Sequence, residues 1–285
     1  MTSTSSSTST RPLPGTRPLP GTRSSTGPLD PVGADLSQVL RALKLSGLKD
    51  TLPERLALAR QHQLGHAAFL QLLLADELAR RESRSASLRA AKAGLDPAMR
   101  IQTWDEHPDL TYDRTLFSDL TSLRFTEAAT GVLILGPVGV GKTHLATALG
   151  HAAIRRRMSV LFARADKLFT RLRAARLDHT LEAEVRRLAA VDVLIIDDFA
   201  LRALDPTQTN DFYELVVERH RKKSTIWVSN REPSEWLAMT TDTLLAQSAI
   251  DRLTSGAHTL IIEGPSHRQR GRVSLDETSE AKHAH

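Results

Sequence analysis

Cysteine is absent from this chain of 285 residues. The absence excludes disulfide bonds and thiolate metal sites, and it fits a protein of a reducing cytoplasm. No apolar run approaches the length of about 20 residues that a membrane-spanning helix needs. We therefore expect a soluble cytoplasmic protein that has no membrane partner.

Aromatic residues are scarce, at 4% of the chain, so few side chains could stack on exposed bases. Acidic residues are fewer than basic ones, with 33 Asp and Glu against 38 Lys and Arg, and the formal net charge is +5. This basic surplus is compatible with a nucleic-acid partner, and equally with an ordinary basic protein.

Residues 1–34 consist largely of Ser, Thr, Pro and Gly, and they repeat RPLPGT at 11–16 and 17–22. Such a segment has too little apolar surface to fold, so we expect a disordered tail. It has no acidic residue before Asp30, as in a transit peptide, but its prolines oppose the amphipathic helix of such a peptide. Residues 271–285 are polar and predict a second flexible tail.

Residues 35–98 predict a small all-α domain. Asp35 is a candidate helix cap, because apolar residues follow it at helical spacing. Pro53 should mark the start of a second helix near 53–63, and a third, arginine-rich helix should cover 66–92.

Residues 99–270 alternate between short apolar segments and helical patterns, which predicts an α/β domain with a five-stranded parallel sheet flanked by helices. Asp205 and Pro206 form a good cap and first-turn pair. We expect strands at 132–135, 159–163, 191–196, 225–229 and 259–262. We expect helices near 142–156, 166–176, 180–189, 206–222 and 244–254.

The segment from Gly136 to Thr143 reads GPVGVGKT and fits the phosphate-binding pattern GxxxxGK[ST]. Glycines let the backbone N–H groups point at phosphate oxygens, and the N-terminus of the following helix adds positive charge. Lys142 should reach the β- and γ-phosphates, and Thr143 should offer its hydroxyl to Mg²⁺. We predict that ATP is bound by Gly136, Pro137, Val138, Gly139, Val140, Gly141, Lys142, Thr143 and His144.

Two acids follow the apolar run Val193–Ile196. The carboxyl edge of an open α/β sheet is where ligands bind, so we expect Asp197 to hold Mg²⁺ and Asp198 to polarise the attacking water. Asn230 follows the apolar run that begins at Ser224, and it is a candidate to orient this water.

Arg252 and Arg268 are candidates to stabilise the charge of the transferring phosphoryl group. On the residues alone, a surface ion pair explains either arginine equally well. Both arginines acquire a role only from the order of motifs in the whole chain.

From Asp35 to Arg268 the chain resembles AAA+ ATPases of the DnaC/IstB group. The motifs GPVGVGKTHLA, LIIDDFAL, STIWVSNREPSEW, AIDRL and GPSHR follow the order and spacing of that group. LRALKLSGLKDTL at 40–52 and RRESRSASLRAAKAGL at 80–95 resemble the front part of IstB proteins, the helper ATPases encoded beside a transposase in insertion sequences. This favours IstB over a DnaC-type helicase loader.

The resemblance implies further roles. Asn230 corresponds to sensor 1, Arg252 to an arginine finger donated to the neighbouring subunit, and Arg268 to sensor 2. A finger acting on a neighbour implies a head-to-tail homo-oligomer. The family implies a bacterial, DNA-associated protein that assembles on DNA with ATP, remodels it and stimulates a transposase. The chain departs from many AAA+ proteins in having Asp198 where they have Glu, and from many family members in having Ala200 where they have Gly.

We expect DNA binding to be largely independent of sequence, because no base-reading motif is present, and therefore strongly salt-dependent. The candidate DNA contacts are the cations of the helix Arg80–Lys92, Arg155, Arg156, Arg157, Lys167, Arg171, Arg173 and Arg176.

The alternative functions for the chain are a helicase loader, a small-molecule kinase and a scaffold that binds ATP without hydrolysing it.

Overall fold

Five short apolar segments form one fully parallel sheet in the computed structural model, which describes residues 32–267. The strands are β1 (Val132–Leu135), β2 (Val160–Arg164), β3 (Val193–Phe199), β4 (Ser224–Ser229) and β5 (His258–Ile261). Their order across the sheet is β2-β3-β4-β1-β5, and β1 pairs with both β4 and β5. The predicted five-stranded parallel sheet is therefore confirmed.

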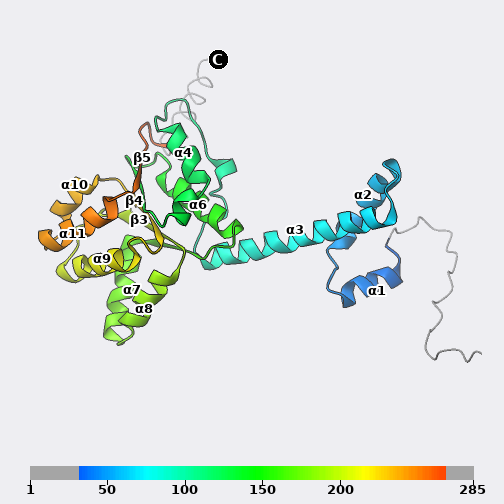
Figure 1. The fold of residues 1–285 in the computed structure, drawn as a ribbon, viewed down its shortest axis with the longest axis horizontal. Coiled ribbons are helices and arrows are strands. Elements are labelled where there is room, and N and C mark those ends of the chain that lie inside the picture. The colour runs from blue at the N-terminus through cyan, green and yellow to red at the C-terminus, as the bar shows by residue number, and fades with distance from the viewer. Residues whose placement is uncertain (1–31, 268–285) are drawn as a thin grey trace, which may run out of the picture. The chain divides into compact units, whose positions relative to one another are not determined.

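The sheet separates two hydrophobic cores, because successive side chains of a strand point to opposite faces. Val132 and Ile134 of β1 face a core with α4 (Arg114–Thr121), α5 (Arg124–Glu127) and α6 (Lys142–Arg155). Leu133 and Leu135 face a second core with α7 (Ala165–Leu177), α8 (Leu181–Ala190), α9 (Pro206–Arg219) and α11 (Thr243–Thr254). Figure 1 shows α4 and α6 on one side of the sheet and α7 and α9 on the other.

The second core is rich in aromatic rings even though the chain has few of them. The ring of Phe199 lies 4.7 to 4.8 Å, centroid to centroid, from the rings of Phe212, Trp227 and Trp236. This cluster lies directly beside the end of β3, so the last residues of that strand are held in a rigid setting.

The chain divides into two compact units between Ala79 and Arg80. The first contains α1 (Ala34–Ala42), α2 (Leu48–Gln61) and the start of α3 (His66–Lys92), and Leu40, Leu48, Leu52 and Leu73 are buried in a small core. α3 continues across the division, so the predicted domain boundaries at residues 34 and 98 stay predictions.

Two local predictions in this region were wrong. Pro53 lies inside α2, which begins five residues earlier than expected. Asp35 lies in the first turn of α1, and the capping position is taken by Gly33. By contrast, Asp205 accepts a hydrogen bond from the backbone N–H of Gln208 at 2.8 Å, so the predicted cap of α9 is confirmed.

The sequence did not predict the short polar helices α4, α5 and α10 (Pro233–Trp236), nor the 3₁₀ turns at Ile101–Thr103 and Leu237–Met239. Of the predicted tail at residues 1–34, residues 1–31 lie outside the described residues, as does the predicted tail at 271–285. At residues 32–34 the prediction was wrong, because Val32 is buried in the small core and α1 begins at Ala34. Within residues 32–267, none of the helices is long and apolar enough to cross a membrane.

Candidate nucleotide site

The loop between β1 and α6 has a backbone that only glycine adopts without strain at three points, Gly139 and the two glycines at the ends of the loop. Gly136 has φ 142°, and a Cβ there would lie 2.0 Å from the carbonyl oxygen of Ile262. Gly141 has φ 103°, and a Cβ there would lie 2.8 Å from the indole ring of Trp104. The two glycines thus let the loop curl between its neighbours and deliver Lys142 to the first turn of α6.

Lys142 is a buried cation. Its side chain is 6% exposed, and Nζ donates a hydrogen bond to the carbonyl oxygen of Pro137 at 2.6 Å. Burial lowers the pKa of Lys142 to about 8, although the nearby carboxylates of Asp197 and Asp198 act in the opposite direction. Within residues 32–267 this is the one hydrogen-bond acceptor of the Lys142 ammonium, and a buried ammonium with a single acceptor is well prepared to receive an anion.

Thr143 and Asp197 meet beside this lysine although 54 residues separate them in the chain. The Thr143 hydroxyl donates to the Asp197 carboxylate, with Oγ1 at 3.0 Å from Oδ2 and 3.1 Å from Oδ1. Burial of Asp197, and then the charge of Asp198, raise the pKa of the Asp197 carboxyl. One hydroxyl and one carboxylate are oxygen donors of the kind that Mg²⁺ takes when phosphates complete its shell, so this pair fits that ion.

Asp198 lies on a bulge in β3. Ile196 pairs with Trp227 of β4, but the next pair joins Phe199 to Ser229, so β3 has one additional residue between them. Asp198 has φ 55°, in the left-handed region that few residues other than glycine adopt. The bulge turns two successive acids toward the same edge of the sheet, and Asp198 lies 3.5 Å from Arg164 Nη2.

A pocket of about 720 Å³, here called the P-loop pocket, joins these groups. Asn230, which follows β4, lines it with Lys142, Thr143, His144 and Asp198. Asp197 is not among the lining residues, but it accepts a hydrogen bond from Thr143, which is one of them. The structure thus brings together the predicted residues from the loop, from β3 and from β4.

The side chain of His144 contacts the segment that precedes the sheet in the chain. Its Nε2 lies 2.9 Å from the carbonyl oxygen of Arg100 and 3.3 Å from Thr103 Oγ1. This ring therefore fastens the residues before the sheet to the first turn of α6. The predicted contact of His144 with nucleotide stays a prediction.

Arg252 does not line the P-loop pocket. It lies in the last turn of α11 and lines a different pocket with Gly131, which precedes β1, and Thr225, at the start of β4. Its Nη1 donates to the carbonyl oxygen of Ser248 at 2.8 Å, and its guanidinium lies 5.7 Å from the ring centroid of Tyr213. Arg252 therefore belongs to the opposite edge of the sheet. Arg268 lies outside the described residues.

Among the lining residues of the P-loop pocket that sequence reasoning missed are Trp104 and Arg164. Trp104 packs on Gly141, its ring centroid lies 5.6 Å from that of His144, and its buried indole N–H has no hydrogen-bond partner within residues 32–267. No motif marks this tryptophan. Arg164 could have been found, because it ends β2 at the carboxyl edge of the sheet, where open α/β sheets bind ligands.

Comparison with known proteins identifies relatives along most of the chain. The family model described as "IstB-like ATP binding protein" matches residues 38–274. A protein of Mycobacterium tuberculosis (strain ATCC 25618 / H37Rv), named as an ATP-binding protein in an insertion sequence, is 39% identical over 83% of this chain and 95% of its own length. A Pseudomonas aeruginosa protein, also named as an insertion-sequence ATP-binding protein, is 32% identical over 82% of this chain and 88% of its own length.

Among solved structures, that of DnaI aligns with a TM-score of 0.50 at 22% identity, over 57% of this chain and 90% of the other. This likeness concerns the fold alone. It agrees with a P-loop AAA+ architecture for the part of the chain that carries the sheet.

Proposed function

The chain belongs to the family of IstB-like ATP-binding proteins, and from this membership we propose that it hydrolyses ATP to assist the transposase of an insertion sequence. One observation carries the hydrolytic part of the proposal. The Thr143 hydroxyl and the Asp197 carboxylate, from distant parts of the chain, lie in hydrogen-bond contact beside the buried ammonium of Lys142. A lysine, a hydroxyl and a carboxylate placed together in this way are what a bound nucleoside triphosphate with Mg²⁺ requires.

Binding rests on the loop from Gly136 to Thr143. Its backbone N–H groups and the N-terminus of α6 offer hydrogen bonds and positive charge to the phosphates. Lys142 neutralises the β- and γ-phosphates, and its lowered pKa returns toward the ordinary value when these anions approach. Thr143 and Asp197 would hold Mg²⁺, whose charge neutralises the phosphate oxygens.

Hydrolysis needs a group that accepts a proton from water. We assign this role to Asp198, whose carboxylate lines the P-loop pocket with Asn230. Water attacks the γ-phosphorus, the bond to the β–γ bridging oxygen breaks, and the proton of the water passes to Asp198. Asn230 has no hydrogen-bond partner within residues 32–267, so its amide is available to orient this water.

Within residues 32–267, the P-loop pocket of one chain contains no arginine beyond Arg164, which is already paired with Asp198. We propose that Arg252 acts on the nucleotide of a second copy, which requires a head-to-tail assembly. Arg268 is proposed to read the γ-phosphate within its own subunit. Both roles rest on the correspondence of the motifs AIDRL and GPSHR with those of the family.

The experiment that tests hydrolysis measures phosphate release by the full chain with ATP, Mg²⁺ and duplex DNA, for wild type and Asp198→Asn. We expect the variant to bind ATP with unchanged affinity and to lose at least about a hundredfold in kcat. Asp178→Asn, the same chemical change at an exposed position after α7, is the matched control and should keep full turnover. A wild type that binds ATP but never releases phosphate would instead support an ATP-gated scaffold.

The proposed DNA partner is contacted through exposed cations. Many of the predicted contacts are paired with acids: Arg157 with Glu82, Arg171 with Glu184, Arg173 with Asp205, and Arg176 with Asp211. The exposed candidates whose side chains have neither an acidic partner nor a hydrogen-bond partner within residues 32–267 are Arg84, Lys92, Arg155 and Lys167; Arg156 has no acidic partner either, but it donates to the carbonyl oxygen of Ser122. Since phosphates need not compete with a carboxylate at these four positions, we propose that they contribute most to backbone binding.

Salt dependence tests this partner. The affinity for a mixed-sequence duplex should fall steeply as salt rises, and Arg155→Gln should reduce the slope of log K against log salt by about 1. Arg173→Gln, which removes a cation already paired with Asp205, is the matched control and should change the slope less. An affinity that does not respond to salt would contradict the proposal.

The transposase partner is supported by the printed names of the relatives, which place them in insertion sequences. A helicase loader could use the same fold and the same ATP chemistry. The two functions are separated by a binding assay against the transposase of the neighbouring gene and against a replicative helicase. Binding to the helicase alone would overturn the transposition assignment and leave the ATPase assignment intact.

A further inference from the structure

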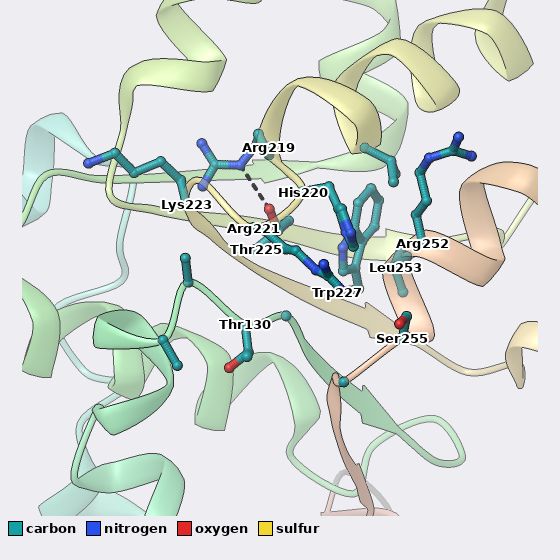
Figure 2. Close-up of a pocket in the computed structure, with 15 residues that line it drawn as sticks. Thr130, Arg219, His220, Arg221, Lys223, Thr225, Trp227, Arg252, Leu253 and Ser255 are labelled. Atoms are coloured by element: carbon teal, nitrogen blue, oxygen red, sulfur yellow. Dashed lines mark hydrogen bonds between the residues drawn. The ribbon is translucent and has the colours of Figure 1, made fainter.

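A second pocket lies at the edge of the sheet opposite the P-loop pocket. It has a volume of about 370 Å³ and is bounded by the residues before β1, by the end of α9 and by the end of α11. Five of its lining residues are basic and none is acidic. Figure 2 shows the five basic side chains of this pocket, here called the basic pocket: Arg219, His220, Arg221, Lys223 and Arg252.

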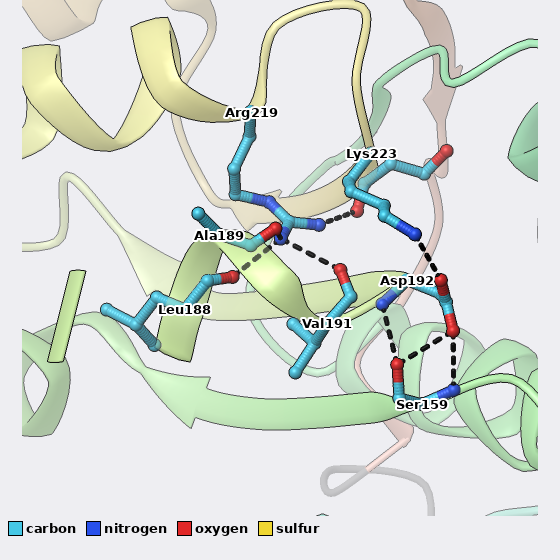
Figure 3. A network of polar contacts seen from close by, with 8 residues as sticks. Ser159, Leu188, Ala189, Val191, Asp192, Arg219 and Lys223 are labelled. Atoms are coloured by element: carbon cyan, nitrogen blue, oxygen red, sulfur yellow. Dashed lines mark hydrogen bonds and ion pairs between the residues drawn. The ribbon is translucent and has the colours of Figure 1, made fainter. Parts of the chain in front are cut away.

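Two of the four lysine and arginine side chains already have partners. Arg219 is 2% exposed and donates to Thr225 Oγ1 at 2.8 Å and to carbonyl oxygens that include those of Leu188 and Val191, at 2.6 and 2.9 Å. Lys223 Nζ lies 2.5 Å from Asp192 Oδ1. Figure 3 shows the contacts of Arg219 with the carbonyl oxygens and of Lys223 with Asp192, and Figure 2 shows the contact of Arg219 with Thr225. These two side chains therefore hold the turn between α9 and β4 in place.

Arg221 is different. It is exposed, and within residues 32–267 it has neither a hydrogen-bond partner nor an acidic partner. It lines the basic pocket together with Arg252, whose guanidinium contacts uncharged groups, at Ser248 and Tyr213. Besides the buried Arg219, the pocket thus contains two arginines that have no carboxylate partner in the part of the chain that the structure describes.

The opposite edge of the same sheet has the complementary charge. Asp96, Asp105 and Asp198 line the P-loop pocket against two cations, Lys142 and Arg164, and a bound triphosphate adds further negative charge. In a head-to-tail assembly, two different surfaces of neighbouring copies meet, so these two edges of the sheet can face each other. The basic pocket of one copy is thus complementary to the nucleotide edge of another.

We infer that Arg221 is a second cation that acts on the partner copy's nucleotide, donating hydrogen bonds to its phosphate oxygens beside Arg252. This inference rests on the proposed function, because it requires the same head-to-tail assembly. It adds a residue for which neither composition nor any motif of the chain gave a role. The site in each copy is then completed by two arginines from one pocket of its neighbour.

The backbone at Arg221 allows a clean test. Its φ is 57°, in the left-handed region that glycine and asparagine adopt readily, so Arg221→Asn and Arg221→Gly remove the cation without straining the turn. Arg221→Lys keeps the charge. Lys222→Gln is the matched control, because Lys222 lies in the same turn, pairs with Glu218 at 3.4 Å and does not line the pocket.

The experiment measures ATP hydrolysis by the full chain. Arg221→Asn should lower kcat at least about tenfold with ATP affinity little changed, Arg221→Lys should recover part of the loss, and Lys222→Gln should match wild type. Mixing Arg221→Asn with Lys142→Ala should restore hydrolysis, because the second chain supplies both arginines to the intact P-loop of the first. Mixing Arg221→Asn with the double variant Lys142→Ala, Arg221→Asn should not restore hydrolysis, because neither chain then supplies Arg221.

Three results would overturn the inference while leaving the proposed function standing. The first is an unchanged kcat for Arg221→Asn in an assay where Arg252→Ala has lost hydrolysis. The second is a loss that mixing does not restore. The third is an unchanged kcat with a weakened, less salt-dependent affinity for DNA, which would assign the basic pocket to nucleic-acid phosphate. If wild type itself does not hydrolyse ATP, the proposed function and the inference fail together.

Discussion

Arg252 and Lys142 lie at opposite edges of one parallel sheet, Arg252 in the last turn of α11 and Lys142 in the first turn of α6. A single copy of the chain therefore cannot bring this arginine to the phosphates that its own lysine would bind. The two residues can act on one nucleotide only when they come from two copies.

Arg252→Ala should bind ATP with the affinity of wild type and lose hydrolysis by about a thousandfold, the scale of an arginine that stabilises a transferring phosphoryl group. Equilibrium binding of a fluorescent ATP analogue and phosphate release would measure the two quantities separately. Arg202→Ala, an exposed arginine after β3 outside the P-loop pocket, is the control. Weakened binding by Arg252→Ala in dilute, monomeric protein would contradict the assignment.

Nucleotide affinity should depend on pH through Lys142. Its pKa is about 8 in the structure, and bound phosphate favours the charged form and raises that pKa. Below pH 8 the Lys142 side chain is already protonated, so its contribution to nucleotide affinity should not change with pH. Above pH 8 binding must take up a proton, and affinity should fall by up to about tenfold per pH unit.

Titration of ATP binding above pH 8 checks this sign. Lys142→Arg supplies a charge that does not titrate in this range, so its affinity, although weaker, should not change with pH. An equal decline in both proteins would assign the effect to a group other than Lys142.

His151 should make the fold sensitive to mild acid. It is buried in α6, and its Nε2 lies 2.8 Å from the carbonyl oxygen of Asp96. Burial lowers the pKa of His151 from the ordinary value of 6.5. The unfolded chain therefore binds a proton more readily than the folded chain, and the free energy of unfolding should fall as pH drops below 6.5 toward the pKa of the folded protein.

Urea unfolding at a series of pH values measures this loss. In His151→Gln, whose amide can still donate to the Asp96 carbonyl, the decline should be smaller than in wild type. His62→Gln, at an exposed position after α2, is the control that should leave the decline unchanged.

Arg219 should contribute strongly to stability. Burial lowers its pKa to about 10, and its guanidinium satisfies carbonyl oxygens at the end of α8 and at the start of β4. Arg219→Met keeps most of the volume but leaves these buried acceptors unpaired, which should cost about 3 kcal/mol in the free energy of unfolding. Chemical denaturation measures the difference, and a cost below about 1 kcal/mol would show that water replaces the guanidinium.

The sequence was most informative where local chemistry determines structure. Apolar runs predicted the strands, and the glycine–lysine pattern predicted the loop between β1 and α6. Asp205 and Pro206 predicted the start of α9, because a cap acts within three residues of its own position. These features depend on near neighbours and can be derived without tertiary structure.

Features that depend on distant residues could not be derived in this way. The bulge at Asp198 results from the pairing of β3 with β4, and the position of Trp104 results from packing against Gly141. The ion pairs of Arg173 and Arg176 join α7 to the start and the middle of α9. These two arginines are therefore less available to bind DNA than the run of basic residues in the sequence suggested. Strand order likewise cannot be derived from hydrophobic periodicity.

The packing of Trp104 on Gly141 also provides a natural optical probe. The chain has three tryptophans, and the other two, Trp227 and Trp236, are 3% and 1% exposed in the aromatic core on the far side of the sheet. Of the three tryptophans, only Trp104 touches the loop that is proposed to bind the phosphates. A change in intrinsic fluorescence on adding nucleotide should therefore report on that loop, and Trp104→Phe should abolish the signal, so the unmodified chain reports its own ligand.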